Sequence, residues 1–219
     1  MARNRKNTRH TASTKIALGV ATVLHIFGVA GLLFSKGLTY QLVLDLVPIN
    51  LIITTLLALK FNSQYDLPFF KFAGAAFLIG FGIEVIGVNT GWPFGQYQYG
   101  ETLGISVWNT PVLIGLNWFL VCYGVGSLLG KFKFSGWIKW ILSIVLLVFL
   151  DYFIEPVAVR HQFWAWTSGN IPVTNYLGWA MVSGIIMGFY FFYLNTRKNE
   201  VAAGIWLIQL GFFVLQNLF

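Results

Sequence analysis

Seven apolar runs of about 20 residues divide this 219-residue chain and limit its possible folds more than any other feature. Such a run, when poor in charge, is typical of a membrane-spanning helix, because about 20 helical residues cross the hydrocarbon core of a bilayer. We therefore predict an all-α, polytopic membrane protein with about seven transmembrane helices. The expected spans are Ile16–Phe34, Leu38–Leu59, Phe69–Val88, Pro111–Leu129, Trp137–Glu155, Asn175–Leu194 and Val201–Leu218.

The composition agrees with a membrane protein. Charged residues make up 10% of the chain and hydrophobic residues 57%, whereas a soluble domain carries about 25% charged residues. The spans leave little chain for a second domain. We expect a basic N-terminal segment, residues 1–15, followed by one transmembrane domain, residues 16–219. The single cysteine, Cys122, excludes an intrachain disulfide and a cysteine-based metal site.

Basic residues set the expected orientation, because Lys and Arg gather on the cytoplasmic side of membrane proteins. With the basic N-terminal segment in the cytoplasm, only two of the 14 basic residues, Lys36 and Arg160, fall on the outer side. We thus predict a multi-pass protein of the cytoplasmic membrane with a cytoplasmic N-terminus and an outer C-terminus. The net charge of +7 then reflects topology and contact with lipid, not nucleic-acid binding.

Two outer connections, Asn89–Thr110 and Pro156–Thr174, are too long for simple turns and are rich in Gly, Pro, Trp and Tyr. An aromatic belt at the membrane interface is one interpretation. The other is a cap over a pocket, in which aromatic faces hold a cation or a flat conjugated ligand. The aromatic residues that gather there are Trp92, Tyr97, Tyr99, Trp108, Trp164, Trp166 and Trp179.

Four of the seven acidic residues lie within the expected spans, all in the outer half of the membrane. An ionisable side chain inside a membrane is costly and is therefore a candidate functional residue. These four residues are Asp45, Glu84, Asp151 and Glu155.

Asp151 and Glu155 are four residues apart and share one helix face, with about 5–6 Å between their Cβ atoms. Two carboxylates this close in a low dielectric cannot both ionise cheaply, so one supplies a general acid beside a general base. Pro156 is expected to end the helix, and Arg160 and His161 can then fold back to neutralise the second carboxylate. A structural ion-pair network without chemistry is the alternative.

Other polar residues at the same membrane level are candidates for supporting roles. Asn175 opens the sixth span, where capping of the helix explains it as well as catalysis does. No His or Cys pair has metal-ligand spacing, so we expect no metal site. The supporting candidates are Asp45, Asn89, Asn117, Arg160, His161 and Asn175.

Two other classes of membrane protein fit less well. A retinal protein needs a lysine deep in a helix, and the last span contains none. A transporter built from inverted repeats has broken helices at the midplane. Here Glu84 and Glu155 are each followed by a connection with Trp, Gly and Pro on the same side, which indicates a parallel repeat if any.

Two stretches resemble motifs of membrane carotenoid biosynthesis proteins. The first is GWPFGQYQY at residues 91–99, continued by Leu103-Gly104. The second runs from Asp151 to Pro156 and on through FWAW at residues 163–166, Gly169, IP at 171–172, Asn175 and Gly178-Trp179. Together they are similar to the CruF-type carotenoid 1,2-hydratases, over a region from about Glu84 to Trp179. In the family pattern Asp is expected before the proline as often as not. Here the residue is Glu155, whose side chain is one methylene longer than that of Asp.

The resemblance implies addition of water to the terminal C1–C2 double bond of an acyclic carotenoid end, without a cofactor. A protonated carboxylic acid would protonate C2, aromatic faces would hold the tertiary cation at C1, and a second carboxylate would deprotonate the attacking water. Asp151 and Glu155 are then the expected acid–base pair, and Glu84 is the rival acid. The expected substrate-binding residues are Trp92, Tyr97, Tyr99, Trp164, Trp166 and Trp179.

The implied partners are a lipophilic carotenoid such as lycopene or γ-carotene, water and membrane lipid, with other carotenoid-pathway enzymes left open. Two alternatives stay open at this point. One is a related lycopene cyclase, which uses the same acid chemistry but loses a proton instead of gaining water. The other is a carotenoid-binding or transport protein without turnover.

Overall fold

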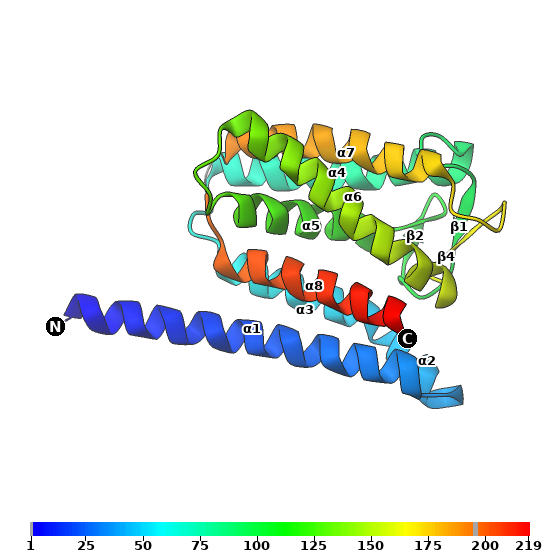
Figure 1. Ribbon diagram of the computed structural model, residues 1–219, viewed down its shortest axis with the longest axis horizontal. Coiled ribbons are helices and arrows are strands. Elements are labelled where there is room, and N and C mark those ends of the chain that lie inside the picture. Colours follow the sequence, from blue (N-terminus) through cyan, green and yellow to red (C-terminus); the bar gives the residue numbers. More distant parts are fainter. Residues whose placement is uncertain (1, 195–196) are drawn as a thin grey trace.

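The computed structural model is a bundle of helices with two short strand pairs gathered at one end (Figure 1). It describes residues 2–194 and 197–219, with side chains from Thr11 onward. Most side chains of the expected basic N-terminal segment therefore lie outside the described residues. The helices are α1 (Ala2–Phe34), α2 (Gly37–Asp45), α3 (Val47–Lys60), α4 (Leu67–Thr90), α5 (Leu113–Leu129), α6 (Gly136–Arg160), α7 (Val173–Tyr193) and α8 (Glu200–Leu218). The strands are β1 (Tyr97–Tyr99), β2 (Ser106–Val107), β3 (Thr110–Pro111) and β4 (Trp164–Trp166).

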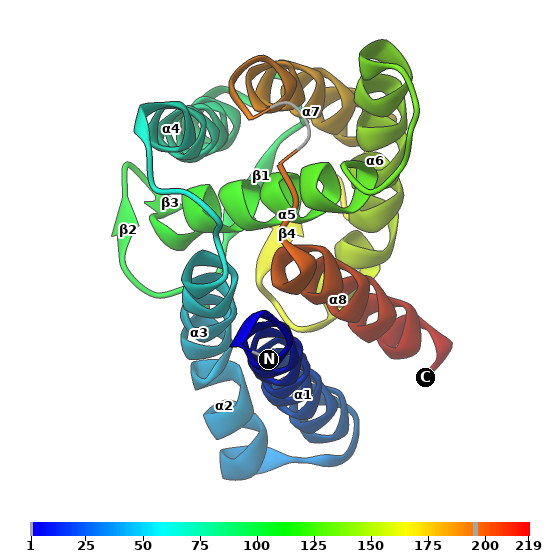
Figure 2. The ribbon, with the colours of Figure 1, turned by 90° about the vertical axis from the view of Figure 1, so that its left-hand side faces the viewer.

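Among the residues that the structure describes, six helical spans are long and apolar enough to cross a membrane, with α2 and α3 together forming one of them. The seventh apolar helix, α5, has 17 residues and lies in the middle of the bundle, against α3, α4, α6, α7 and α8 (Figure 2). Nearly all of its side chains are buried. The expectation of an all-α, polytopic membrane protein is confirmed.

Two helix bounds differ from the sequence prediction near the N-terminus. Helix α1 begins at Ala2, well before the expected Ile16. The second span breaks at Leu46, where α2 ends and α3 begins. Pro48 lies in the first turn of α3, and its missing N–H removes a hydrogen bond from the helical ladder, which accounts for the break.

The prediction that Pro156 ends the fifth expected span is wrong, because the corresponding helix, α6, continues through it to Arg160. Membrane helices tolerate an internal proline where neighbouring helices support the freed backbone groups. The extra turn places Glu155 below the helix end rather than at it.

The two ends of the bundle differ in character. At the end that holds the N-terminus, Asp66 caps α4 and accepts two hydrogen bonds from Arg197, at 2.7 and 2.6 Å. Asn199 caps α8 and donates to the Ala58 carbonyl. The strands and the C-terminus lie at the opposite end (Figure 1).

Candidate active site

A two-stranded ribbon joins the two long connections at the end of the bundle opposite the N-terminus. Strands β1 and β4 pair antiparallel, with Tyr97 opposite Trp166 and Tyr99 opposite Trp164. Because side chains alternate along a strand, the two tyrosines and the two tryptophans share one face of the ribbon. The residues between them, Gln98 and Ala165, are exposed. The ribbon therefore presents four aromatic side chains toward the helices below.

Glu84 on α4 receives three hydrogen bonds and is buried. Its Oε2 accepts from the hydroxyls of Tyr97 and Tyr99, at 2.5 and 2.7 Å. Its Oε1 accepts from Trp118 Nε1 on α5, at 2.9 Å. The carboxyl is thus held by the ribbon on one oxygen and by the following helix on the other.

Glu155 on α6 is held in the same way. Its Oε2 accepts from the indole nitrogens of Trp164 and Trp166, at 3.1 and 2.8 Å. Its Oε1 accepts from Asn175 Nδ2 on α7, at 3.0 Å. Each glutamate therefore has two donors from the strand that follows its helix and one from the next helix along the chain. The arrangement has the parallel sense that the sequence indicated for a repeat.

Asp151 lies behind this second carboxyl group. Asn175 Nδ2 also donates to Asp151 Oδ2, at 2.8 Å, so one amide bridges Asp151 and Glu155. Asp151 is fully buried, and its Oδ1 has no hydrogen-bond partner among the described residues. The capping role considered for Asn175 is wrong, because the N-cap of α7 is Pro172 and no side chain that the structure describes caps the helix; the Asn175 amide binds the two carboxyl groups instead.

Glu84 and Glu155 line one small cavity of about 30 Å³, whereas Asp151 does not reach it. This volume holds one or two water molecules. Trp179 also lines it and stacks on Trp118, with ring centroids 4.1 Å apart. The full lining is Glu84, Phe94, Tyr97, Tyr99, Ile114, Asn117, Ile154, Glu155, Trp164, Trp166, Asn175 and Trp179.

Two glycines on α4 make room for the donors of Glu84. A Cβ on Gly80 would lie 2.4 Å from Trp118 Cβ, and one on Gly87 would lie 2.8 Å from Tyr97 Oη. Both distances are too short for a side chain to fit without movement. The close approach of Trp118 and Tyr97 to α4 therefore depends on glycine at these positions.

The two tyrosine hydroxyls keep their protons. Burial raises the pKa of both Tyr97 and Tyr99 well above the ordinary range. A protonated hydroxyl can donate a hydrogen bond and can also accept one, unlike an indole N–H.

Several expected site residues lie away from the cavity. Asp45 is exposed and accepts from Gln41, and Trp92 is 58% exposed. Asn89 donates to the Trp108 carbonyl and so fixes the β2–β3 hairpin to α4. These residues contribute nothing to the carboxyl pair in this structure.

The expectation that Arg160 and His161 neutralise a carboxylate is also wrong. Arg160 donates to the Gln216 carbonyl at 2.8 Å, and His161 Nδ1 lies 2.8 Å from the Tyr40 hydroxyl. Because α6 continues past Pro156, both residues point away from Glu155 and toward α8 and α2.

Sequence reasoning missed Trp118 because it considered only tryptophans in or beside the connections. Its neighbour Asn117 was identified, but a tryptophan directly after it inside a span looked like ordinary packing. The available signal was an indole N–H at the membrane depth of the acidic residues, since such a group needs a partner when buried.

The chain matches the family of carotenoid biosynthesis proteins over residues 39–218 and belongs to that family. A bisanhydrobacterioruberin hydratase from Haloarcula japonica is similar to it, with 29% identity over 158 residues. The match covers 63% of this chain and 51% of the relative, so the chain spans about half the length of that protein. No solved structure matches the chain. The family resemblance identified from residues 84–179 is thus confirmed.

Proposed function

We propose that this protein is an enzyme that adds water to the terminal C1–C2 double bond of an acyclic carotenoid end, without a cofactor. The observation that carries the proposal is a pair of buried glutamates that line one water-sized cavity with aromatic walls. The family supplies the substrate class, and the hydratase from Haloarcula japonica supports the reaction type.

The hydrogen-bond partners distinguish the two carboxyl groups. Glu155 is held by two indole N–H groups and one amide N–H, which donate and cannot accept, and this favours its ionised form. Glu84 Oε2 is held by two hydroxyls, and a hydroxyl can turn to accept the proton of a neutral acid. Two carboxyl groups on one small cavity do not both ionise cheaply. We therefore assign Glu84 as the acid and Glu155 as the base.

The reaction follows from these two states. Glu84 gives its proton to C2 of the alkene, and a tertiary cation forms at C1. The indole faces of Trp179 and Trp164 lie in the same cavity and can stabilise that cation. Water attacks C1 and loses a proton to Glu155, which leaves a neutral alcohol, an ionised Glu84 and a protonated Glu155. The proton then returns from Glu155 to Glu84 through the next water, so each turnover consumes only water and alkene.

In this proposal Asp151 has a positioning role, in place of the acid–base role expected from its spacing in the sequence. It does not line the cavity, and it reaches Glu155 only through Asn175. Its carboxyl fixes the orientation of the Asn175 amide, which in turn holds Glu155 Oε1.

We also propose that the site faces the outer side of the cytoplasmic membrane, as the distribution of basic residues predicts. The site lies at the ribbon end of the bundle, below the connections that cap it. A boundary position suits a reaction between a lipid-soluble alkene and water.

Expression in a lycopene-producing bacterium, followed by mass analysis of the pigments, tests this proposal. The wild type should convert lycopene to products heavier by the mass of one water for each reacted end. Glu84→Gln and Glu155→Gln should each reduce conversion by about 10²–10⁴-fold, the usual contribution of a general acid or base. Glu101→Gln, a change at an exposed acidic residue of the same end, should leave conversion unchanged.

Other products would overturn the assignment. A product of unchanged mass with a shifted spectrum would identify a cyclase. Wild-type conversion in both glutamine variants would show that these carboxyl groups do not react. A lack of change with both lycopene and γ-carotene, despite bound pigment, would indicate a binding protein.

A further inference from the structure

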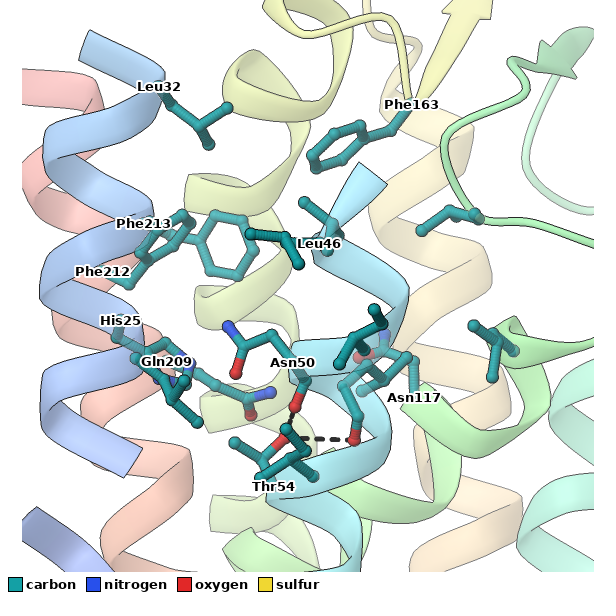
Figure 3. A pocket seen from close by; sticks show the side chains of 18 of the residues that line it. His25, Leu32, Leu46, Asn50, Thr54, Asn117, Phe163, Gln209, Phe212 and Phe213 are labelled. Carbon is teal, nitrogen blue, oxygen red and sulfur yellow. Dashed lines mark hydrogen bonds between the residues drawn. The ribbon is translucent and has the colours of Figure 1, made fainter. Parts of the chain in front are cut away.

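A second, larger cavity of about 270 Å³ lies between α1, α3, α5 and α8 (Figure 3). We refer to it as the chamber. Figure 3 shows its walls extending from Leu32 and Phe163 to Thr54, with Phe212 and Phe213 on one side. Its lining is mainly aliphatic and aromatic side chains, so it suits a hydrocarbon.

The chamber adjoins the carboxyl cavity. Four residues line both spaces: Ile114 and Asn117 on α5, Ile154 on α6 and Trp164 on β4. Two cavities that share side chains in this way are separated by no more than the thickness of those side chains. A long molecule in the chamber would therefore end within the thickness of one side chain of the cavity that Glu84 and Glu155 line.

The chamber also opens toward the lipid. Three of its lining residues are largely exposed on the outside of the bundle: Phe27 on α1 at 73%, Leu46 at 55% and Ile49 on α3 at 49%. Leu46 is the residue at which α2 and α3 separate. All three are apolar, and all three belong to helical spans that cross the bilayer by length and composition. The mouth thus faces hydrocarbon, not water.

We propose that the chamber binds the isoprenoid chain of the substrate and admits it sideways from the bilayer, between α1 and α3. This inference rests on the proposed function, because it takes the carboxyl cavity as the place where the chain end reacts. A carotenoid dissolves in the membrane interior, so a mouth at that depth lets it enter without crossing water. Water, the second reactant, then enters the site from the ribbon end of the bundle.

Two substitutions test the chamber by filling it from different helices. Leu24→Trp enlarges a lining residue on α1, and Val23→Trp is its control, because Val23 is exposed and does not line the chamber. Ile49→Trp obstructs the mouth from α3, and Ile52→Trp is the control on the lipid face of the same helix. Size-exclusion chromatography of each variant in detergent checks that it folds.

The measurement is the amount of lycopene that the purified protein, in lipid nanodiscs, takes up from liposomes, with conversion followed in the same samples. Leu24→Trp and Ile49→Trp should each retain at least about tenfold less lycopene than the wild type, and both controls should match the wild type. Equal retention of lycopene by all variants would overturn the proposal. A chamber that holds phospholipid in place of lycopene would overturn it as well. A wild type that binds lycopene through the chamber but adds no water would refute the proposed reaction and leave the chamber assignment standing.

Discussion

Gly87→Ala should weaken the support of Glu84 in a way that the geometry allows us to estimate. An alanine Cβ at this position would lie 2.8 Å from Tyr97 Oη, 2.9 Å from Phe94 Cδ2 and 3.3 Å from Tyr97 Cε1. Both aromatic rings are buried, so neither can move away freely. Tyr97 must shift, and its 2.5 Å hydrogen bond to Glu84 is lost or distorted.

The expected magnitude combines three effects. Overpacking a filled site costs about 1–3 kcal/mol. Loss of one buried hydrogen bond costs about 1 kcal/mol. Replacement of glycine by alanine inside a helix stabilises the helix by about 1 kcal/mol. Gly87→Ala should therefore lower the free energy of unfolding by about 1–3 kcal/mol.

Gly82→Ala is the matched control on the same helix, because a Cβ there has nothing within 4 Å. It should gain up to about 1 kcal/mol from helix propensity alone. For a chain of this size, 1 kcal/mol corresponds to roughly 2–4 °C in the unfolding midpoint. The two variants should thus differ by about 1–4 kcal/mol, which thermal unfolding in detergent should show as about 2–16 °C, and only Gly87→Ala should lose conversion of lycopene.

The companion variant Tyr97→Phe tests the cause. Removal of the hydroxyl eliminates the closest contact, so Gly87→Ala should cost less in the Tyr97→Phe background than in the wild type. The reasoning fails if Gly87→Ala melts at or above the temperature of Gly82→Ala. It also fails if the two substitutions at residues 87 and 97 are strictly additive.

Three further outcomes are expected. Trp118→Phe removes the 2.9 Å hydrogen bond to Glu84 but keeps most of the ring stacking, so it should lower the free energy of unfolding by about 1 kcal/mol. Thermal unfolding and lycopene conversion check this. Gln209→Leu should raise stability by about 1 kcal/mol, because the buried Gln209 Oε1 has no partner among the described residues; an unchanged or lower midpoint contradicts this. Arg197 holds the pKa of Asp66 below its ordinary value, so their pair stabilises the fold above the unfolded pKa of about 3.9 and loses this contribution as the pH falls through the lower folded value. The midpoints of wild type and Arg197→Gln should therefore differ at pH 6 and converge only in strong acid.

The sequence predicted the helical bundle well because membrane spans are defined by long apolar runs, which need no tertiary information. It predicted Glu84 and Glu155 because a carboxyl group at that depth needs a compensating environment. Membrane depth does not specify the helix face, however. Asp45 was expected at the same depth as the two glutamates, but its side chain is exposed and accepts a hydrogen bond from Gln41.

The partners of the carboxyl groups were harder to predict. Strands β1 and β4 are three residues each and lie more than 60 positions apart, so local sequence patterns contain no signal for their pairing. The expected neutralisation by Arg160 depended on the helix ending at Pro156, and tertiary packing overrides that local preference. Trp118 needed knowledge of which face of α5 meets α4, which sequence periodicity does not give for a helix buried on nearly all sides.

The two carboxyl sites have the same connectivity but different donors, and this difference bears directly on function. In both, a glutamate near the ribbon end of a helix accepts two hydrogen bonds from alternate residues of the next strand and one from the next helix. Phenols occupy the strand positions in one site and indoles in the other. Only the phenol can accept a hydrogen bond from a protonated carboxyl group as well as donate one to a carboxylate. In the proposed function, two such sites facing one water-sized space would supply unlike protonation states from a single structural plan, which is the pair that hydration of an alkene requires.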